Sequence, residues 1–345
     1  MYESFFGLRE RPFDLTPNPQ YLVLTDVHRE ALSNLDYGIN SRKGITLLLG
    51  EAGSGKTTVI RAAVDRQPAR VHCVHLNNPA LSREEFVEML AGRFGFSEAA
   101  RTSKAALLME LETFLKSRRS FGETTVLIVD EAQALPSELL EEIRLLANIE
   151  TDKEKLLLLV LAGQPELAER LNEQGLRQLK QRIALRCELR PLTLQETAAY
   201  IAGRIKAAGG VGAQVFTLEA VTKIFERSRG IPRVISVIAD NALVGAFARG
   251  QRPVKSQIVL EVCKDFDFTG ADRPEEHGFP SEGGQAGPSR VLDLAQAVAA
   301  KHSDAAPKAA ASRPAESSGG RVARLLSAPE SRWRRFFLER RSVQR

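Results

Sequence analysis

Strand-like and helix-like patterns alternate along the first half of this 345-residue chain. Short runs rich in apolar and β-branched residues, which we interpret as strands, occupy 45–49, 71–76, 125–129 and 156–163. Between these runs the apolar residues recur at helical spacing, which predicts helices from Gly55 and over 82–95, 103–119 and 137–149. Apolar strands separated by helices indicate a parallel sheet covered on both faces. We therefore expect a doubly wound α/β domain.

The residues before the first expected strand follow a different pattern. The opening stretch FFGLRERPFDLTPNPQYL contains several prolines, which argue against a helix before about Val27. The next stretch, VHREALSNLDYGI, has helical apolar spacing at Ala31, Leu32, Leu35 and Ile39. We predict a helix here as the last element before the sheet.

After the stretch LRCELRPLT the pattern becomes helical throughout. Helical spacing covers 193–208, 217–228, 232–249 and 255–265, with Gly and Pro turns between. Beyond about Phe268 the chain is rich in Ala, Gly, Ser, Pro and charge, a composition that buries too little apolar surface to fold. We expect an α/β core with an N-terminal extension over 1–190, a small helical lid domain over 191–268, and a disordered tail over 269–345.

The end of the expected tail, RWRRFFLERR, has Trp333, Phe336 and Phe337 at helical spacing among arginines. This pattern fits a peptide that docks on a partner, an acidic membrane surface or a nucleic acid. It fits equally well a solvated chain end with incidental aromatic residues. The sequence leaves both interpretations open.

Composition indicates where in the cell the protein is expected. Hydrophobic residues make up 43% and charged residues 26% of the chain, as in ordinary globular proteins. No apolar run approaches the roughly 20 residues that span a bilayer, and the N-terminus lacks the apolar segment of a secretory signal. The cysteines Cys73, Cys187 and Cys263 are scattered, which does not favour a disulfide framework or a zinc site. We expect a cytoplasmic protein without a transmembrane segment, peripheral at the inner membrane only through a partner.

The net charge of +5 is concentrated at the C-terminal end. Residues 271–345 contain 13 Lys and Arg against 9 Asp and Glu, so only +1 falls on residues 1–270. DNA binding requires several cations that neutralise phosphates on one face. A nucleic-acid partner is therefore not favoured for the folded part.

The stretch LLLGEAGSGKTTVI carries the most specific chemistry, because it fits the phosphate-loop pattern G-x-x-x-x-G-K-T. Glycines allow backbone N–H groups to turn toward phosphate oxygens, and the following helix adds its positive dipole end. We expect Lys56 to bridge the β- and γ-phosphates of ATP, and the Thr57 hydroxyl to bind Mg²⁺. The expected nucleotide-binding residues are Gly50, Glu51, Ala52, Gly53, Ser54, Gly55, Lys56, Thr57 and Thr58.

A second acidic element follows in TTVLIVDEAQ. Asp130 ends the apolar run, where its carboxylate can meet the metal through water. Glu131 follows directly and suits a carboxylate that polarises the attacking water, which small-molecule kinases do not need. The alternative is that both residues only cap the next helix.

Two further residues fit the same scheme. Gln164 ends the run LLLLVLAGQ, where it could orient the water or touch the γ-phosphate; alternatively it caps the helix that begins at Pro165. Arg233, in RGIPRVISVI, stands at the start of a helix, where the dipole disfavours a cation unless a phosphate compensates. Its alternative is a surface arginine whose stem covers apolar neighbours.

Together these motifs resemble an AAA+ ATPase. The segments GEAGSGKT, VLIVDEAQ, LAGQPEL and GIPR are similar to Walker A, Walker B, sensor 1 and sensor 2 of that class. With the opening MYESFFGLRERPFDLTPNPQYL and HREALSNLDYGI, they resemble the ExeA/GspA group: general secretion pathway protein A and relatives in exosortase-linked and pilus loci. The likeness covers about residues 1–265. It implies ATP hydrolysis, a helical lid and assembly as a homo-oligomer or on a partner.

The resemblance also suggests roles for arginines. It implies that Arg233 is sensor 2, and that Arg182 in QLKQRIALRCELRPL is the arginine finger on a neighbour's ATP, with Arg186 as second choice. Ordinary surface charge is the alternative for both Arg182 and Arg186. The secretion proteins carry a membrane-spanning segment and a peptidoglycan-binding region after the ATPase, and neither is visible in this sequence.

Three functions follow as hypotheses. The first is a Mg-ATP hydrolase that assembles or remodels a protein partner at a secretion, envelope or exopolysaccharide system. The second is a DNA-associated AAA+ protein of the transposition-regulator or initiator type, because related ATPases share DEAQ and a lid arginine. The third is a switch that holds ATP and hydrolyses it slowly.

Overall fold

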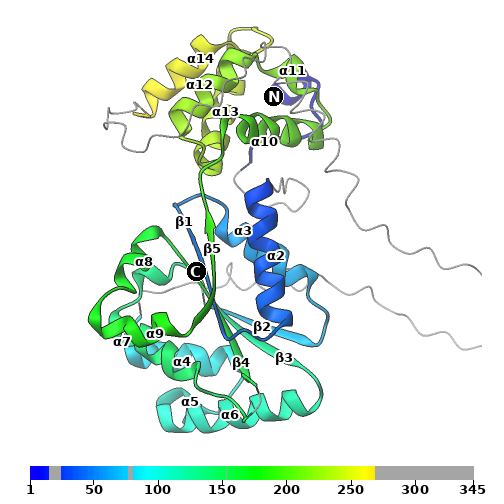
Figure 1. Ribbon diagram of the computed structural model, residues 1–345. Helices are drawn as coiled ribbons and strands as arrows, with labels where there is room; N and C mark the ends of the chain where they lie inside the picture. The colour runs from blue at the N-terminus through cyan, green and yellow to red at the C-terminus, as the bar shows by residue number, and fades with distance from the viewer. Residues whose placement is uncertain (15–24, 77–80, 153, 269–345) are drawn as a thin grey trace, which may run out of the picture. The chain divides into compact units, whose positions relative to one another are not determined.

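The computed structural model describes residues 1–14, 25–76, 81–152 and 154–268 (Figure 1). The expected tail over 269–345, with its basic aromatic end, lies outside these residues. Within them, no helix is both long enough and apolar enough to cross a membrane.

A five-stranded sheet forms the centre of the α/β part, with strand order β2-β3-β4-β1-β5 and every neighbouring pair parallel. The strands are β1 (Ile45–Gly50), β2 (Val71–Leu76), β3 (Thr124–Val129), β4 (Leu157–Gly163) and β5 (Ile183–Leu189). The four strands expected from the sequence are confirmed. Because all the strands run the same way, their carboxyl ends meet at one edge of the sheet.

The central strands are apolar throughout because both of their faces are buried. Every residue of β1 and of β4 is buried. Successive side chains of a strand point to opposite faces, so Leu47 and Leu49 join one apolar cluster while Leu48 joins another. The doubly wound α/β class is thus confirmed.

Helices cover both faces of this sheet. One face packs against α2 (Asp26–Asn40) and α3 (Lys56–Arg66). The other packs against helices that include α4 (Arg83–Phe94), α6 (Lys104–Ser120) and α7 (Ser137–Leu146). Shorter elements complete this layer: α5 (Glu98–Thr102), α8 (Pro165–Arg170), α9 (Arg177–Gln181) and the 3₁₀ turns Ala132–Ala134 and Gln174–Leu176.

The strand β5 was not expected from the sequence. Its residues alternate between outward-facing Ala184, Arg186 and Glu188 and the more buried positions of the other face. Among the described residues it pairs with β1 alone, as the last strand of the sheet. The alternation of polar and apolar residues is the signal that could have identified it.

Five helices follow β5 in the part of the chain that the structure describes; four match the predicted helical segments closely, and the short α11 was not predicted. They are α10 (Leu194–Ala207), α11 (Gly212–Val215), α12 (Leu218–Ser228), α13 (Pro232–Ala248) and α14 (Ser256–Asp265). α10 begins with a capping box, in which Thr193 accepts from the Glu196 N–H and the Glu196 carboxylate accepts from the Thr193 N–H. The apolar faces of these helices form a cluster separate from those of the sheet.

The first residues of the chain join this helical cluster. A short helix, α1 (Tyr2–Phe6), buries both of its end residues there, together with Leu8 and Phe13. The expectation of no helix before Val27 was wrong for these five residues, because the prolines follow the helix and Gly7 ends it in a left-handed conformation. Residues 1–13 therefore pack with the helical domain, although the expected boundary assigned them to the first domain.

Candidate active site

The phosphate-loop sequence forms the turn between β1 and α3. Gly53 and Gly55 have φ angles of +81° and +104°, which favour glycine. A Cβ on Gly53 would lie 2.6 Å from the Cβ of Arg233, and one on Gly55 would lie 2.9 Å from His28 Nε2. Glycine is therefore required at both positions by backbone conformation and by close neighbours.

Lys56 is the first residue of α3, and only 4% of it is exposed. Its Nζ donates to the carbonyl oxygens of Gly50 at 2.7 Å and Glu51 at 3.1 Å. Burial lowers the pKa of the ammonium group, while the nearby carboxylates of Glu131 and Asp130 oppose that shift. The cation is thus held at the loop by neutral carbonyls, from which a phosphate can draw it.

The two residues expected to hold the metal lie together. Thr57 Oγ1 donates to Asp130 Oδ2 at 2.7 Å. Asp130 follows β3, and its backbone N–H donates to the Leu76 carbonyl at the end of β2. Only 6% of Asp130 is exposed. The geometry brings a hydroxyl and a carboxylate oxygen, the hard oxygen donors that suit Mg²⁺, to one point beside the phosphate loop.

Glu131 and Gln164 also meet at the carboxyl edge of the sheet. Gln164 Nε2 donates to Glu131 Oε2 at 3.4 Å. A residue that the sequence analysis missed, Gln133, donates to the same oxygen at 2.7 Å and accepts from the Gln164 backbone N–H at 3.1 Å. Glu131 itself has φ +55°. The two amides therefore fix a carboxylate whose backbone conformation is unusual for a side-chain-bearing residue.

Arg170 is a second residue that the sequence analysis missed. From α8 its guanidinium donates to the carbonyl oxygens of Gln133 at 2.6 Å and Leu135 at 2.7 Å, and to Ser137 Oγ at 3.2 Å. These contacts span the loop that follows Glu131. Because the partners are more than thirty residues away in sequence, no local pattern reveals this role.

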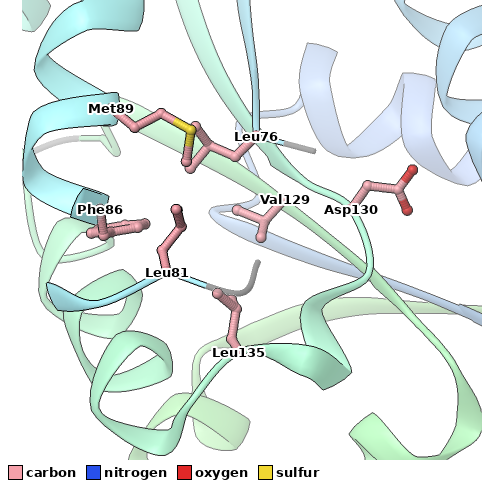
Figure 2. Close-up of a pocket in the computed structure, with 7 residues that line it drawn as sticks. All are labelled: Leu76, Leu81, Phe86, Met89, Val129, Asp130 and Leu135. Atoms are coloured by element: carbon pink, nitrogen blue, oxygen red, sulfur yellow. The ribbon is translucent and has the colours of Figure 1, made fainter. Parts of the chain in front are cut away.

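A small hollow lies behind the acidic residues, between β2, β3 and α4. It is lined by Leu76, Leu81, Phe86, Met89, Val129, Asp130 and Leu135. Figure 2 shows that Asp130 directs its carboxylate away from the apolar side chains of this group. Because the other lining residues are apolar, the polar contact of that carboxylate with Thr57 lies on the phosphate-loop side.

The three arginines singled out from the sequence fall into two groups. Arg233, in the first turn of α13, donates its backbone N–H to the Gly53 carbonyl at 3.2 Å, so it lies at the phosphate loop. Arg182 is exposed and directly follows α9 as its C-cap residue. Arg186 lies on the exposed face of β5, where it pairs with Glu188 at 3.3 Å. All three arginines are exposed, and Arg233 differs from Arg182 and Arg186 by its backbone contact with the phosphate loop.

Comparison with known sequences agrees with this geometry. A family model described as an AAA domain matches residues 39–171. General secretion pathway protein A of Aeromonas hydrophila is 41% identical over 254 residues, which amount to 74% of this chain and 46% of that protein. The chain thus spans just under half the length of this relative.

Solved structures share the fold. The ORC2 protein of Aeropyrum pernix, in its ADPNP-ADP complexes, aligns with a TM-score of 0.56 and 18% identity, covering 74% of this chain and 71% of that one. The Drosophila ORC bound to DNA gives a TM-score of 0.56 and 20% identity, with coverage of 74% and 64%. At such identities the likeness concerns the fold alone. From the family model and the sequence relative, we conclude that residues 39–171 match an AAA domain and that the chain is similar to general secretion pathway protein A over 254 residues.

Proposed function

We propose that this chain binds Mg-ATP at the phosphate loop and hydrolyses it to drive assembly or remodelling of a protein partner. The observation that supports this most strongly is the convergence of Thr57, Asp130, Glu131 and Gln164 beside Lys56. Thr57 and Asp130 would hold Mg²⁺, because they offer hard oxygens next to the phosphate loop. When bound, the metal would neutralise charge on the transferred phosphoryl group.

Each residue has a distinct role in this proposal. Lys56 leaves the loop carbonyls to contact the β- and γ-phosphates. Glu131 takes the proton of the attacking water, and Gln133 and Gln164 hold its carboxylate in place.

The exposed arginines support assembly into an oligomer. Arg233 lies at the phosphate loop of its own chain and serves as sensor 2 in this proposal. Arg182 is exposed, so it is available to reach the γ-phosphate of a neighbouring copy, where an added cation stabilises transition-state charge. Arg186 is the second choice, because Glu188 already pairs with it.

The relative's name, general secretion pathway protein A, supports a partner in a secretion or envelope system. We place the protein in the cytoplasm, peripheral at the inner membrane through that partner.

Mixing two inactive variants tests the shared site. Arg182→Ala should lose most turnover while it keeps an intact Glu131, and Glu131→Gln should lose turnover while it keeps an intact Arg182. If the finger acts between copies, a mixture should regain turnover that neither variant shows alone. Turnover per subunit of the unmodified chain should also rise with protein concentration. No recovery at any mixing ratio would contradict the role of Arg182.

A further inference from the structure

We propose that His28 is a positioning residue of the phosphate loop, which holds the Ser54–Gly55 peptide so that its N–H group faces the bound phosphates. This inference rests on the proposed function, since it concerns nucleotide binding at the same loop. His28 lies outside the phosphate-loop motif, in the first turn of α2.

The side chain of His28 is enclosed and bonded at both ring nitrogens. Only 6% of His28 is exposed, and the same holds for Thr25. Nε2 lies 3.0 Å from the Ser54 carbonyl oxygen, and Nδ1 lies 2.7 Å from Thr25 Oγ1. A carbonyl only accepts, so Nε2 carries the proton and donates it to Ser54. In the neutral ring Nδ1 is then the acceptor, and the Thr25 hydroxyl donates to it.

Burial supports this neutral state of the ring. It lowers the pKa of His28 and outweighs two influences that raise it, the hydrogen bond to the Ser54 carbonyl and, more weakly, the Glu196 carboxylate. Glu196 is itself paired with Arg190 at 2.9 Å. The ring therefore stays neutral at pH 7 with the proton on Nε2, and the Thr25 hydroxyl fixes that tautomer.

The hydrogen bond to Ser54 controls the direction of one peptide unit. In a trans peptide the C=O and the following N–H point in opposite directions. A Ser54 carbonyl that points at His28 turns the Gly55 N–H away from His28. An inward-facing N–H at this position is what an anion-binding loop requires. Since Gly55 has φ +104° and no side chain, this peptide would rotate easily if its carbonyl were released.

Other carbonyls of the loop also accept hydrogen bonds, one from outside the motif and two from its own lysine. The Gly53 carbonyl accepts from the Arg233 N–H at 3.2 Å, and those of Gly50 and Glu51 accept from Lys56 Nζ. When phosphate draws Lys56 away, its two carbonyls lose that donor, whereas the donor from His28 remains. His28 is thus one of the supports that persist in the nucleotide-bound loop.

The helix that carries His28 is a rigid support. The α2 residues Val27, Ala31 and Leu32 are buried in the same apolar cluster as Val59 and Ile60 of α3. The two helices therefore hold His28 and the loop in a fixed relation. A site supported by packed helices is more precise than one supported by a loop alone.

Three variants of the full chain test the proposal: His28→Phe, which keeps the ring without a donor; His28→Gln, whose amide can donate to Ser54; and Thr25→Val, which removes the hydroxyl. Affinities for Mg-ATP and Mg-ADP are measured by calorimetry, and unfolding temperatures are measured without nucleotide. We expect His28→Phe to weaken both affinities by about tenfold, His28→Gln to recover to within about threefold, and Thr25→Val to lose about threefold.

A purely structural role would give a different pattern. The Phe and Gln variants would then change the unfolding temperature and leave both affinities at the unmodified value, which would overturn the proposal. Equal loss of affinity in the Phe and Gln variants would overturn it as well. If His28→Phe does not fold, the nucleotide affinities of Thr25→Val and His28→Gln decide. Unchanged affinities in Thr25→Val would then contradict the role of the Thr25 hydroxyl in orienting His28. Failure of the unmodified chain to bind either nucleotide would instead refute the proposed function.

Discussion

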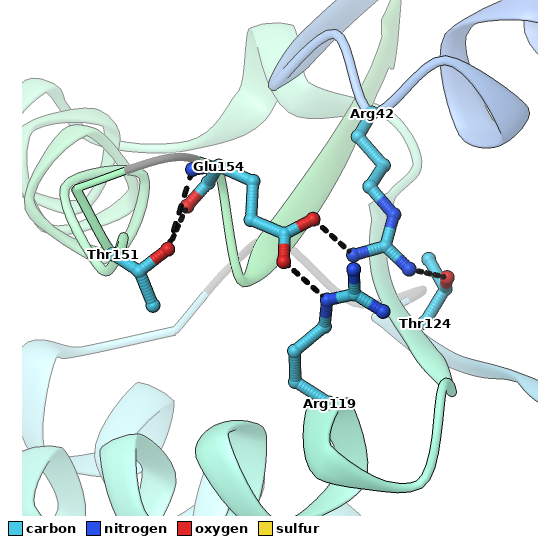
Figure 3. Close-up of polar contacts among 5 residues, drawn as sticks. All are labelled: Arg42, Arg119, Thr124, Thr151 and Glu154. Carbon is cyan, nitrogen blue, oxygen red and sulfur yellow. Dashed lines mark hydrogen bonds and ion pairs between the residues drawn. The ribbon is translucent and has the colours of Figure 1, made fainter.

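The edges formed by the amino ends and by the carboxyl ends of the strands both carry charged residues, but these charges have different kinds of partner. At the amino edge, Glu154 before β4 lies between Arg42 and Arg119 (Figure 3). Its Oε2 accepts from Arg42 Nη1 at 2.7 Å, its Oε1 accepts from Arg119 Nε, and Arg42 also donates to Thr124 at 3.1 Å. Here two arginines from separate parts of the chain share one carboxylate.

At the carboxyl edge the charges are held by neutral groups. Lys56 donates to carbonyls, and Glu131 accepts from two amides. Over the ranges that the structure describes, neither residue forms an ion pair within 4.0 Å. The difference teaches that a charge paired within the protein serves stability, whereas a charge held by dipoles remains available to a ligand.

The substitution Glu131→Gln should have the largest effect, because it removes the carboxylate and keeps the shape. We expect turnover to fall by about 100- to 10,000-fold, the usual contribution of a general base, while ATP stays bound. Steady-state hydrolysis and nucleotide titration on the same sample measure both. The matched control at the other edge, Glu154→Gln, should leave turnover per folded molecule unchanged; a comparable loss there would remove the distinction between the edges.

Lys56→Ala should affect binding rather than folding. Loss of a charge-assisted contact to phosphate should weaken ATP affinity by about 10- to 100-fold. The unfolding free energy should not fall by the amount that removal of an ion-pair partner would cost, because Lys56 contacts only neutral carbonyls in the free chain. Titration calorimetry and chemical denaturation separate the two effects. A large loss of unfolding free energy with unchanged ATP affinity would reverse this interpretation.

Glu154→Ala should show the opposite behaviour. It leaves two arginines without their shared carboxylate, and we expect the unfolding free energy to fall by about 1.5 kcal/mol, a modest value because the pairs are partly exposed. Glu154→Gln should lose about half as much, since its amide oxygen still accepts one bond. Denaturant midpoints measure the series, and nucleotide affinity per folded molecule should not change. A Glu154→Ala chain as stable as the unmodified one would show that the amino-edge cluster is not stabilising.

Acidification should lower the stability of the protein in two pH ranges, one set by His75 and the other by Glu154. Burial lowers the pKa of His75, on β2, to about 4. The unfolded chain then binds more protons below pH 6.5, so stability is full above that pH and falls by about 1 kcal/mol between pH 6.5 and 5.5. The arginines, Arg119 foremost, lower the pKa of Glu154, so its contribution is full above pH 4.5 and disappears only at lower pH.

Denaturation at half-unit pH steps measures these windows. The variant His75→Gln should flatten the profile between pH 6.5 and 5.5, and Glu154→Gln should not. An identical slope in His75→Gln would assign that window to other groups.

The sequence was sufficient to predict strands and site residues that are marked by a short, continuous stretch of the chain. The phosphate loop, Asp130 and Glu131 follow from motifs within ten residues, and β1 to β4 follow from apolar runs. The role of Arg170 and the contact of Gln133 with Gln164 could not be predicted, because they join separate elements. β5 was missed because an edge strand with one exposed face has no continuous apolar run.

The packing of residues 1–13 into the helical domain has a consequence for the order in which the chain can fold. The Tyr2 hydroxyl donates to Asp240, 238 positions later, and the Arg9 N–H donates to the Ala208 carbonyl. The sheet domain is thus an insertion within the helical domain. During synthesis the five described strands of the sheet are complete by Leu189, whereas the apolar N-terminal residues must wait for α13 to emerge before they can be buried.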